Sequence, residues 1–281
     1  MTYLNLDSNF APYGKGIDFQ TLDFPSGCEP HIKLQALTAD AITITTRIQS
    51  SKDLMMLLLA TDALKRSGIE QIHLLLPYLP FARQDRVMVP GEPLSVKVIA
   101  DLLNLQGYKS VSIFDAHSEV SLALIDRSKS ISNHDFAKKA LEGKTEYLIC
   151  SPDAGAYKKI FKLCQAIGYP DEIVLCNKIR DVSNGQIKKI TVDREDLQGK
   201  DVYIVDDICD GGGTFVALAQ ALKSRNCGKI FLLVSHGIFS KGFDVLSEIE
   251  HIYTTDSFKD FEAHPKLTQI KLSDLFINYN L

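Results

Sequence analysis

Short apolar runs alternate with segments of helical hydrophobic spacing along most of the chain. The runs typical of β-strands cover residues 41–46, 72–76, 111–114, 147–150, 172–176, 201–205 and 230–234. The segments with helical spacing cover residues 54–66, 94–105, 155–167 and 214–224. Alternation of strand and helix predicts βαβ units, in which mainly parallel sheets are flanked by helices. The expected fold class is therefore α/β.

One polar stretch, residues 128–135, interrupts this alternation, which then resumes with the same rhythm. In both halves, an acidic or histidine-bearing turn follows a strand. We therefore expect two similar α/β domains, over residues 1–134 and 135–267, with a ligand site between them. The segment 268–281 can return to the first domain, a point that the sequence alone leaves open.

The composition narrows the class of protein without identifying it. The chain has 281 residues, of which 45% are hydrophobic and 23% charged, as in soluble globular proteins. A net charge of −4 without any local Lys/Arg cluster argues against nucleic-acid binding. No apolar run reaches membrane-spanning length, and residues 1–7 lack the basic and apolar regions of a signal peptide. We expect a cytoplasmic protein with neither a nucleic-acid nor a membrane partner.

The most informative segment is the end of the apolar run 201–205, where Asp206, Asp207 and Asp210 precede three glycines and Thr214. A strand, a glycine turn and a helix N-terminus form an anion site, because unpaired N–H groups and the helix dipole converge there. Thr214 is expected to cap the helix and to donate its hydroxyl to a phosphate. An ordinary tight turn is the alternative, but carboxylates buried without a ligand would be costly. Carboxylates beside a phosphate site suit the hydroxyl groups of a sugar, so we expect a phosphorylated sugar as ligand.

Two clusters in the first half are candidates for chemistry. Arg83-Gln84-Asp85 follows a buried strand, and the planar guanidinium of arginine suits phosphate oxygens. Asp115-x-His117 ends another strand, so its two polar side chains are expected on one face, where the histidine could bind a cation or act as a base. A surface turn with an ion pair and a core histidine are the respective alternatives.

Two further clusters lie in the second half. Asp153 stands between a strand and a helix, where it can reach a metal ion, cap the helix, or do both. Lys178 and Arg180 point the same way on an extended segment that leads into flexible turn residues. Such a basic segment suits charge stabilisation during phosphoryl-type transfer, although a solvated charged hairpin would have the same sequence.

Taken in order with the glycine loop, these clusters resemble the ribose-phosphate diphosphokinase family (synthetases of phosphoribosyl diphosphate, PRPP) over nearly the whole chain. Type I phosphoribosyltransferases share only the loop at 206–214. The resemblance implies two phosphoribosyltransferase-like domains, the first binding ATP and the second ribose 5-phosphate. The implied reaction is attack of the sugar's 1-hydroxyl on the β-phosphorus of Mg-ATP, which yields PRPP and AMP. A phosphoribosyltransferase that consumes PRPP and a non-catalytic regulatory subunit are the alternatives.

The resemblance also implies residue roles. Catalysis falls to Lys178 and Arg180, and the Mg²⁺ cofactor to His117 and Asp153. ATP would be bound by Phe24, Glu29, Arg83, Gln84, Asp85 and His117. Ribose 5-phosphate would be bound by Arg180, Asp206, Asp207, Asp210, Gly211, Gly212, Gly213 and Thr214. The family also implies a homo-oligomer, with a dimer as its smallest unit and a hexamer as an open alternative.

The chain departs from the family pattern at three places. An extra residue separates Phe24 from Glu29, the segment 87–92 lacks basic residues, and the run 118–122 differs from the usual one. The first departure puts nucleotide preference in doubt. The other two affect regions of allosteric control and subunit packing in regulated members of the family. We therefore expect weak or absent inhibition by ADP.

Overall fold

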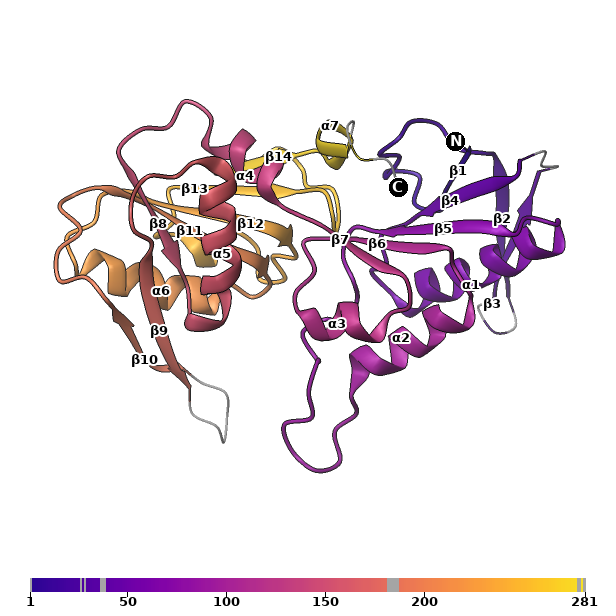
Figure 1. The fold of residues 1–281 in the computed structure, drawn as a ribbon, viewed down its shortest axis with the longest axis horizontal. Helices are drawn as coiled ribbons and strands as arrows, with labels where there is room; N and C mark the ends of the chain where they lie inside the picture. The colour runs from indigo at the N-terminus through magenta and orange to yellow at the C-terminus, as the bar shows by residue number, and fades with distance from the viewer. Residues whose placement is uncertain are drawn as a thin grey trace. The chain divides into compact units, whose positions relative to one another are not determined.

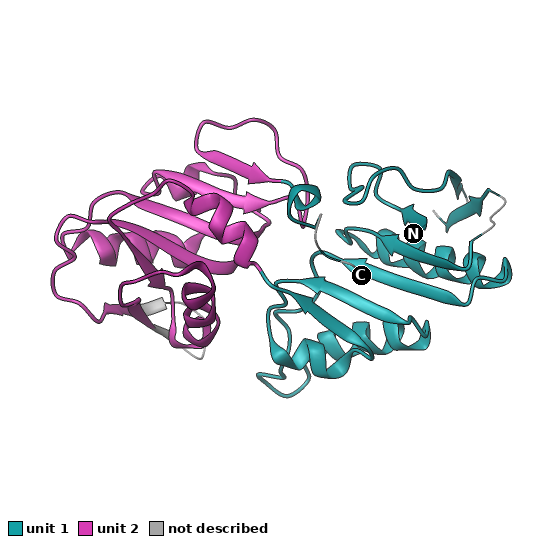
Figure 2. Cartoon of the chain, turned by 45° about the horizontal axis from the view of Figure 1, so that its top comes forward, with its two compact units in different colours: residues 1–132, 271–281 teal, residues 133–270 magenta. Residues whose placement is uncertain are grey.

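A computed structural model describes residues 2–25, 27, 29–35, 39–180, 187–276 and 279, with the side chains of residues 178–180 and 187–189 left out. The chain divides into two compact units, shown in teal and magenta in Figure 2. Unit 1 is Met1–Ser132 together with Lys271–Leu281, and unit 2 is Asn133–Ile270. Unit 2 is thus inserted into the sequence of unit 1. Residues 268–270 belong to unit 2, and the chain returns to unit 1 from Lys271.

Unit 1 is built on a five-stranded parallel sheet with the order β1-β4-β5-β6-β7 and a separate hairpin, β2-β3 (Figure 1). Its strands are β1 (Thr2–Asn5), β2 (Phe19–Phe24), β3 (Glu29–Leu34), β4 (Ala41–Thr45), β5 (Gln71–Leu76), β6 (Ser110–Phe114) and β7 (Ser128–Ile131). Its helices are α1 (Ser51–Arg66), α2 (Ser95–Leu105), α3 (Glu119–Leu124) and α7 (Leu272–Leu275).

The core of unit 1 joins one face of this sheet to α1 and α2. Alternate strand residues such as Ile44, Leu74 and Ile113 are buried against Leu57 of α1 and Ile99 of α2. The start of α1 is fixed by a capping box, in which the side chains of Ser50 and Asp53 satisfy N–H groups at the helix end. The apolar runs and helical spacing in the sequence therefore give the layers that the α/β prediction requires.

Unit 2 is built on a seven-stranded sheet with the order β10-β9-β8-β11-β12-β13-β14 (Figure 1). Its strands are β8 (Tyr147–Ser151), β9 (Val174–Arg180), β10 (Ile187–Val192), β11 (Asp201–Cys209), β12 (Ile230–Gly237), β13 (His251–Thr255) and β14 (Leu267–Ile270). Its helices are α4 (His134–Leu141), α5 (Ala154–Ile167), α6 (Gly213–Lys223) and the 3₁₀ turn η1 (Asp244–Leu246). All of the paired strands are parallel except β9 and β10, which form an antiparallel hairpin.

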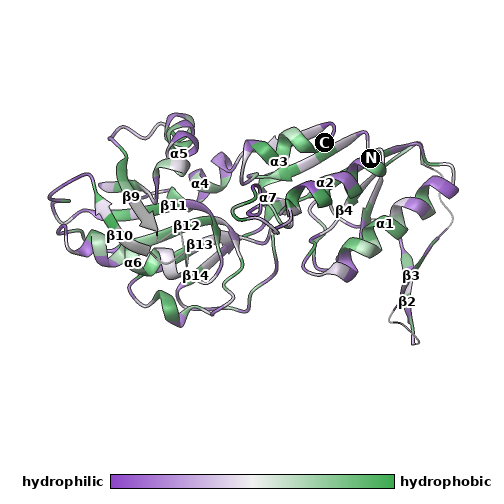
Figure 3. Ribbon diagram, turned by 90° about the horizontal axis from the view of Figure 1, so that it is seen from below, coloured by the Kyte–Doolittle hydropathy of each residue, from purple (hydrophilic) through white to green (hydrophobic). Residues whose placement is uncertain are grey.

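One core cluster of unit 2 lies between the sheet and α6. Ile204 of β11 and Leu232 of β12 are buried against Phe215, Leu218 and Leu222 of the helix. Figure 3, coloured by hydropathy, shows helices that carry both hydrophilic and hydrophobic residues along their length. No helix in the described part of the chain is both long and apolar enough to cross a membrane.

The predicted fold class is confirmed, since each unit has a mainly parallel sheet flanked by helices. Strand β11 was expected over residues 201–205 but extends to Cys209. The extension is held by the parallel neighbour β12, where Ile208 pairs with His236 and Cys209 with Gly237. Asp206 and Asp207 therefore stand within the strand, and only Asp210 follows it. The polar stretch 128–135 contains β7 and the start of α4.

Candidate functional site

The glycine segment connects strand β11 to helix α6 in unit 2. Gly212 is the N-cap residue, with φ 76° and ψ −10°, and α6 begins at Gly213. The predicted capping role of Thr214 is wrong, because Thr214 lies inside the first turn and no side chain caps this helix. The chain needs a left-handed residue at the cap, a conformation that glycine adopts without steric cost and threonine does not.

The N–H groups of this loop are open. Those of Gly211, Gly212, Gly213 and Thr214 have no hydrogen-bond acceptor among the described residues, whereas the N–H groups of Phe215 and Val216 donate to Gly212 O. Consecutive open N–H groups at a helix N-terminus attract anions. A Cβ added to Gly213 would meet no atom within 4 Å, so the space beside this residue is open as well. The geometry suits a phosphate group.

Two carboxylates stand next to the loop on the same strand. The N–H of Asp207 donates to Oδ1 of Asp206 over 2.9 Å, and Asp207 lies 3.9 Å from Nζ of Lys159 on α5. Burial raises the pKa of Asp206 well above its usual range, and the charges of Asp207 and Asp153 raise this pKa further. The three predicted carboxylates Asp153, Asp206 and Asp207 are therefore close enough to interact.

Asp153 is also the N-cap of α5. Its Oδ1 accepts a hydrogen bond from the N–H of Ala156 over 3.0 Å, as the capping alternative predicted. A small pocket beside it is lined by residues of α5 and β11, including Lys159, Asp206 and Asp207, and by Asn133 at the start of the unit. Asn133 donates to Ser235 Oγ over 3.3 Å, which fixes its position at the carboxyl ends of the strands.

Lys178 and Arg180 lie on the last part of strand β9. Their backbones pair with Ile190 and Ile187 of β10, so both residues are part of the β9-β10 hairpin (Figure 1). Their side chains lie outside the described part of the structure, and so does the turn 181–186. The catalytic role of these two residues stays a prediction.

In unit 1, Asp85 joins two of the predicted clusters. Its Oδ1 accepts a hydrogen bond from Nε of Arg86 over 3.0 Å, and Ser118 donates to the same carboxylate. Burial alone would raise the pKa of Asp85, but these hydrogen bonds and the charges of Arg86 and His117 outweigh it and lower that pKa. The Arg-Gln-Asp segment therefore lies beside the Asp-x-His segment, as a common ATP site would require.

The other residues of these clusters have separate environments. Gln84 accepts a hydrogen bond from Ser95 at the start of α2, and Arg83 is exposed. Asp115 has φ 45° and is buried, whereas His117 is exposed. The expectation that Asp115 and His117 share one face is wrong, because a left-handed residue breaks the alternation of an extended strand.

Phe24 and Glu29 face each other across the β2-β3 hairpin of unit 1. Phe24 is about half exposed, at 48%, and its ring meets the His31 ring edge-on at a centroid distance of 5.8 Å. A large apolar side chain in this position is available for stacking with a ligand. The residues that distinguish this hairpin from the family pattern, at 26 and 28, lie outside the described ranges.

The predicted magnesium ligands belong to different units, His117 to unit 1 and Asp153 to unit 2. Among the residues with described positions, no three His, Cys, Asp or Glu side chains are arranged to hold a metal ion. Mg²⁺ is commonly bound by one or two carboxylates together with substrate phosphates, so a complete protein cage is not required. Burial raises the pKa of Asp206, and the neighbouring carboxylates of Asp207 and Asp153 raise it further, so a cation here would offset like charge. These residues therefore fit a divalent cation.

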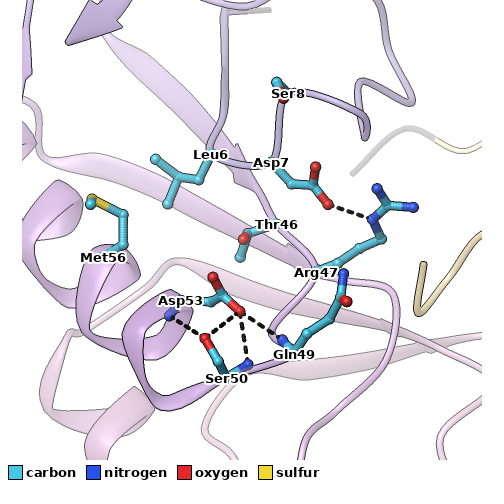
Figure 4. Close-up of a pocket in the computed structure, with 9 residues that line it drawn as sticks. All are labelled: Leu6, Asp7, Ser8, Thr46, Arg47, Gln49, Ser50, Asp53 and Met56. Atoms are coloured by element: carbon cyan, nitrogen blue, oxygen red, sulfur yellow. Dashed lines mark hydrogen bonds and ion pairs between the residues drawn. The ribbon is translucent and has the colours of Figure 1, made fainter. Parts of the chain in front are cut away.

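A pocket of about 390 Å³ lies at the carboxyl ends of β1 and β4 in unit 1 (Figure 4). Arg47 in its wall donates from Nε to Oδ2 of Asp7 over 2.5 Å. The nearby N-terminus of α1 is satisfied by Ser50 and Asp53. Carboxylates of the protein thus compensate both Arg47 and the N-terminus of α1. The pocket therefore has no excess positive charge that would attract an anion. None of the predicted site residues lines it.

Sequence reasoning missed two lysines near the predicted site. Lys159 lies near Asp207, and the stem of Lys241 lies against Gly211. Lys159 follows Asp153 by less than two helical turns, so the start of the expected helix over 155–167 already placed it near the carboxyl edge of the sheet. Lys241 follows strand β12 in a turn, and no spacing in the sequence connects it to Gly211.

Comparisons with known proteins agree with this fold. Two family models match the chain: the N-terminal domain of ribose phosphate pyrophosphokinase over residues 26–107 and the phosphoribosyl transferase domain over residues 123–268. The ribose-phosphate pyrophosphokinase of Mycoplasmopsis pulmonis is 30% identical over 83% of this chain and 74% of its own length. That of Pyrococcus abyssi is 32% identical over 85% and 82%. The crystal structure of phosphoribosylpyrophosphate synthetase from Mycobacterium smegmatis has the same fold, with a TM-score of 0.83 and 22% identity over 94% of this chain and 89% of that one.

Proposed function

Because the chain belongs to the ribose-phosphate pyrophosphokinase (diphosphokinase) family, we propose that it transfers the β,γ-diphosphoryl group of Mg-ATP to the 1-hydroxyl of ribose 5-phosphate. The products are PRPP and AMP. The observation that carries this proposal is the row of open N–H groups from Gly211 to Thr214, next to Asp206 and Asp207. A phosphate site with carboxylates for sugar hydroxyls matches a phosphorylated pentose.

In this proposal, unit 2 holds the acceptor. The loop of Asp210, Gly211, Gly212, Gly213 and Thr214 binds the 5-phosphate through backbone N–H groups and the Thr214 hydroxyl. Asp206 and Asp207 accept hydrogen bonds from ribose hydroxyls and orient the sugar. Orientation of this kind lowers the barrier because the attacking hydroxyl is held in place before reaction.

Unit 1 holds the donor in the same proposal. Arg83, Gln84 and Asp85 bind ATP together with His117, and Phe24 and Glu29 of the β2-β3 hairpin bind its adenine. The support for a shared site is the lowered pKa of Asp85, which reflects its hydrogen bonds to Arg86 and Ser118 and the charge of His117. A buried and fixed carboxylate in this position orients its neighbours.

The proposed Mg²⁺ ligands are His117 and Asp153. The carboxylates of Asp206 and Asp207 would offset part of the positive charge of the ion. When bound, Mg²⁺ neutralises the ATP phosphates and polarises the phosphorus under attack. We assign to Lys178 and Arg180 the stabilisation of negative charge on the diphosphoryl group as it is transferred, and to Arg180 also contact with ribose 5-phosphate. Catalysis then depends mainly on positioning and electrostatics.

One assay tests this function against its rivals. The protein is mixed with Mg-ATP and ribose 5-phosphate, and AMP and PRPP are quantified together. We expect equal amounts of both products, and neither product when ribose 5-phosphate is omitted. AMP without PRPP would contradict the proposal. No product at any magnesium or phosphate concentration would also contradict it, and would favour a regulatory subunit or a phosphoribosyltransferase.

A phosphoribosyltransferase would give a different result, since it consumes PRPP and needs no ATP. The match of residues 26–107 to the N-terminal domain of ribose phosphate pyrophosphokinase does not support that alternative. We further propose that the enzyme acts in the cytoplasm in nucleotide biosynthesis and is a homo-oligomer. Light scattering after size-exclusion chromatography measures the mass of the assembly. A monomeric mass would contradict the proposed homo-oligomer.

A further inference from the structure

The turn that follows strand β12 is tied to the start of the glycine loop. The N–H groups of Ile238 and Phe239 donate to Cys209 O over 2.8 and 3.2 Å, and the N–H of Ser240 donates to Asp210 O over 3.2 Å. Phe239 is buried, and the N–H of Gly242 returns to its carbonyl over 3.0 Å. Backbone hydrogen bonds and a buried ring hold this turn in one position relative to the loop.

The turn places Lys241 on the loop. A Cβ built on Gly211 would lie 3.5 Å from Cε and 3.6 Å from Cδ of Lys241. The end of the lysine stem therefore runs along the glycine whose open N–H begins the phosphate site. A lysine stem can lie on a backbone in this way while its ammonium group stays in solvent.

The ammonium group of Lys241 has no ion pair or hydrogen bond within the described ranges, and the residue is exposed. Three lysines of unit 2 with described side chains have carboxylate partners instead: Lys159 is paired with Asp207, Lys223 with Glu248 and Lys229 with Glu250. Lys241 thus keeps its charge available beside a segment, 210–214, that has a carboxylate but no cation of its own.

This arrangement addresses an electrostatic difficulty of the site. A sugar phosphate carries about −1.5 to −2 charges at neutral pH. It would bind beside Asp206, Asp207 and Asp210, of which Asp206 already has a raised pKa because of burial and neighbouring negative charge. Backbone N–H groups supply only partial positive charge, roughly half an elementary charge at a helix N-terminus. A full cation near the loop offsets the remaining repulsion.

We propose that Lys241 recognises the 5-phosphate of ribose 5-phosphate and so determines the preference of the site for a phosphorylated sugar. The inference rests on the proposed function, since it concerns the same substrate site. Lysine suits this role as a flexible point charge, where a bidentate arginine fork would require a fixed geometry. The contact is partly exposed, so its strength should fall as salt is added.

The test compares three variants of the full chain by calorimetric titration with ribose 5-phosphate in the presence of Mg²⁺. Lys241→Gln removes the charge, Lys241→Arg keeps it, and Lys229→Gln removes the same charge from the opposite end of strand β12. An exposed lysine–phosphate contact contributes about 1 kcal/mol, so Lys241→Gln should weaken binding about fivefold. Lys241→Arg should recover most of this loss, and Lys229→Gln should match the wild type.

Two further readouts separate recognition from a structural role. Lys241→Gln should reduce the salt dependence of ribose 5-phosphate binding, while its affinity for ATP and its unfolding temperature stay at wild-type values. Equal binding by Lys241→Gln and wild type, at low and high salt, would overturn the inference.

Binding and turnover also keep the two proposals apart. If the wild type binds ribose 5-phosphate and forms PRPP, and Lys241→Gln binds the sugar phosphate equally well, the inference alone is refuted. If the wild type binds ribose 5-phosphate but forms no PRPP, the proposed function is refuted. A fivefold loss of ribose 5-phosphate affinity in Lys241→Gln would still support the inference. Absence of ribose 5-phosphate binding by the wild type would refute both.

Discussion

Asp206 and Asp207 are consecutive residues of strand β11, and the N–H of Asp207 donates to the Asp206 carboxylate over 2.9 Å. Both side chains lie in one acidic group with Asp153, where burial and like charge raise the pKa of Asp206. Such an arrangement destabilises the folded protein without a ligand, because the ionised Asp206 loses hydration and gains repulsion. It is explained by a ligand that these carboxylates bind.

Replacement of Asp206 by asparagine should therefore stabilise the fold and impair binding. The folded protein holds the Asp206 proton more tightly than the unfolded chain, so ionisation costs stability above the unfolded pKa. We expect Asp206→Asn to raise the free energy of unfolding at pH 7 by about 1 kcal/mol, and the gain to shrink as the pH falls. Thermal unfolding and ribose 5-phosphate titration measure the two effects. The control Asp171→Asn, which removes an exposed carboxylate before β9, should change neither stability nor ribose 5-phosphate binding. An Asp206→Asn protein less stable than the wild type would contradict this account.

Two neighbouring glycines should respond in opposite ways to alanine. A Cβ at Gly213 meets no protein atom within 4 Å, and alanine is the better helix residue, so Gly213→Ala should stabilise by about 0.5–1 kcal/mol. The same methyl group would enter the phosphate space and weaken ribose 5-phosphate binding about tenfold.

Gly212 is the matched comparison. Its φ is 76°, and an added Cβ would lie 3.0 Å from Cδ2 of Leu246, so Gly212→Ala should destabilise by about 1–3 kcal/mol. Urea unfolding followed by circular dichroism distinguishes the pair. Unchanged sugar-phosphate binding in a stable Gly213→Ala protein would argue against the loop as phosphate site.

The environment of Asp85 predicts that the stability of unit 1 falls in acid. Its pKa is lowered from the usual 3.8, because hydrogen bonds from Arg86 and Ser118 outweigh the effect of burial. The Asp85 carboxylate therefore contributes stability that is complete above the usual pKa and is lost as the pH falls through the lower folded value. Asp85→Asn should cost about 1 kcal/mol at pH 7 and progressively less below about pH 4.

Urea midpoints at pH 7 and pH 3 test this expectation. The exposed Asp126→Asn provides a control in the same unit, and it should behave like the wild type at both values. A difference between Asp85→Asn and wild type that grows in acid would have the wrong sign.

The proposed role of Lys178 predicts a loss confined to turnover. Lys178→Ala should lower kcat by about 10²–10³ and leave ribose 5-phosphate binding nearly intact, because the contact forms mainly in the transition state. Lys200→Ala, in the loop before β11, should keep wild-type kcat. Steady-state AMP release and calorimetric titration give the two quantities, and wild-type turnover by Lys178→Ala would eliminate the assigned role.

The sheets were predictable because parallel strands read as apolar runs and their helices carry a regular apolar spacing. Periodicity alone placed β4, β5, α1 and α6 within a few residues of their observed bounds. The end of β11 was not predictable from its own residues. Its last four residues are polar or mixed and pair because β12 continues beside them to Gly237. Here a tertiary neighbour overrides local composition.

The candidate site, like the sheets, was predictable only in part from the sequence. Sequence order indicated the glycine loop and its carboxylates, and the structure gives the loop the open N–H groups that the prediction needs. It could not indicate that Gly212 rather than Thr214 caps α6, since the cap depends on backbone angles that several residues determine together. Nor could it indicate Lys241, which a turn after a different strand brings to Gly211.

The insertion of unit 2 into unit 1 has a consequence for how the protein is made. Phe276, almost fully buried, packs its ring against Phe114 at 5.9 Å and Tyr13 at 6.1 Å between centroids. A ribosome synthesises these two partners early and Phe276 only after the whole of unit 2. The nascent first unit therefore waits, with part of its apolar surface uncovered, until translation of the second is complete. Unit 2, being continuous in sequence, is able to fold before the earlier-made unit has all of its parts.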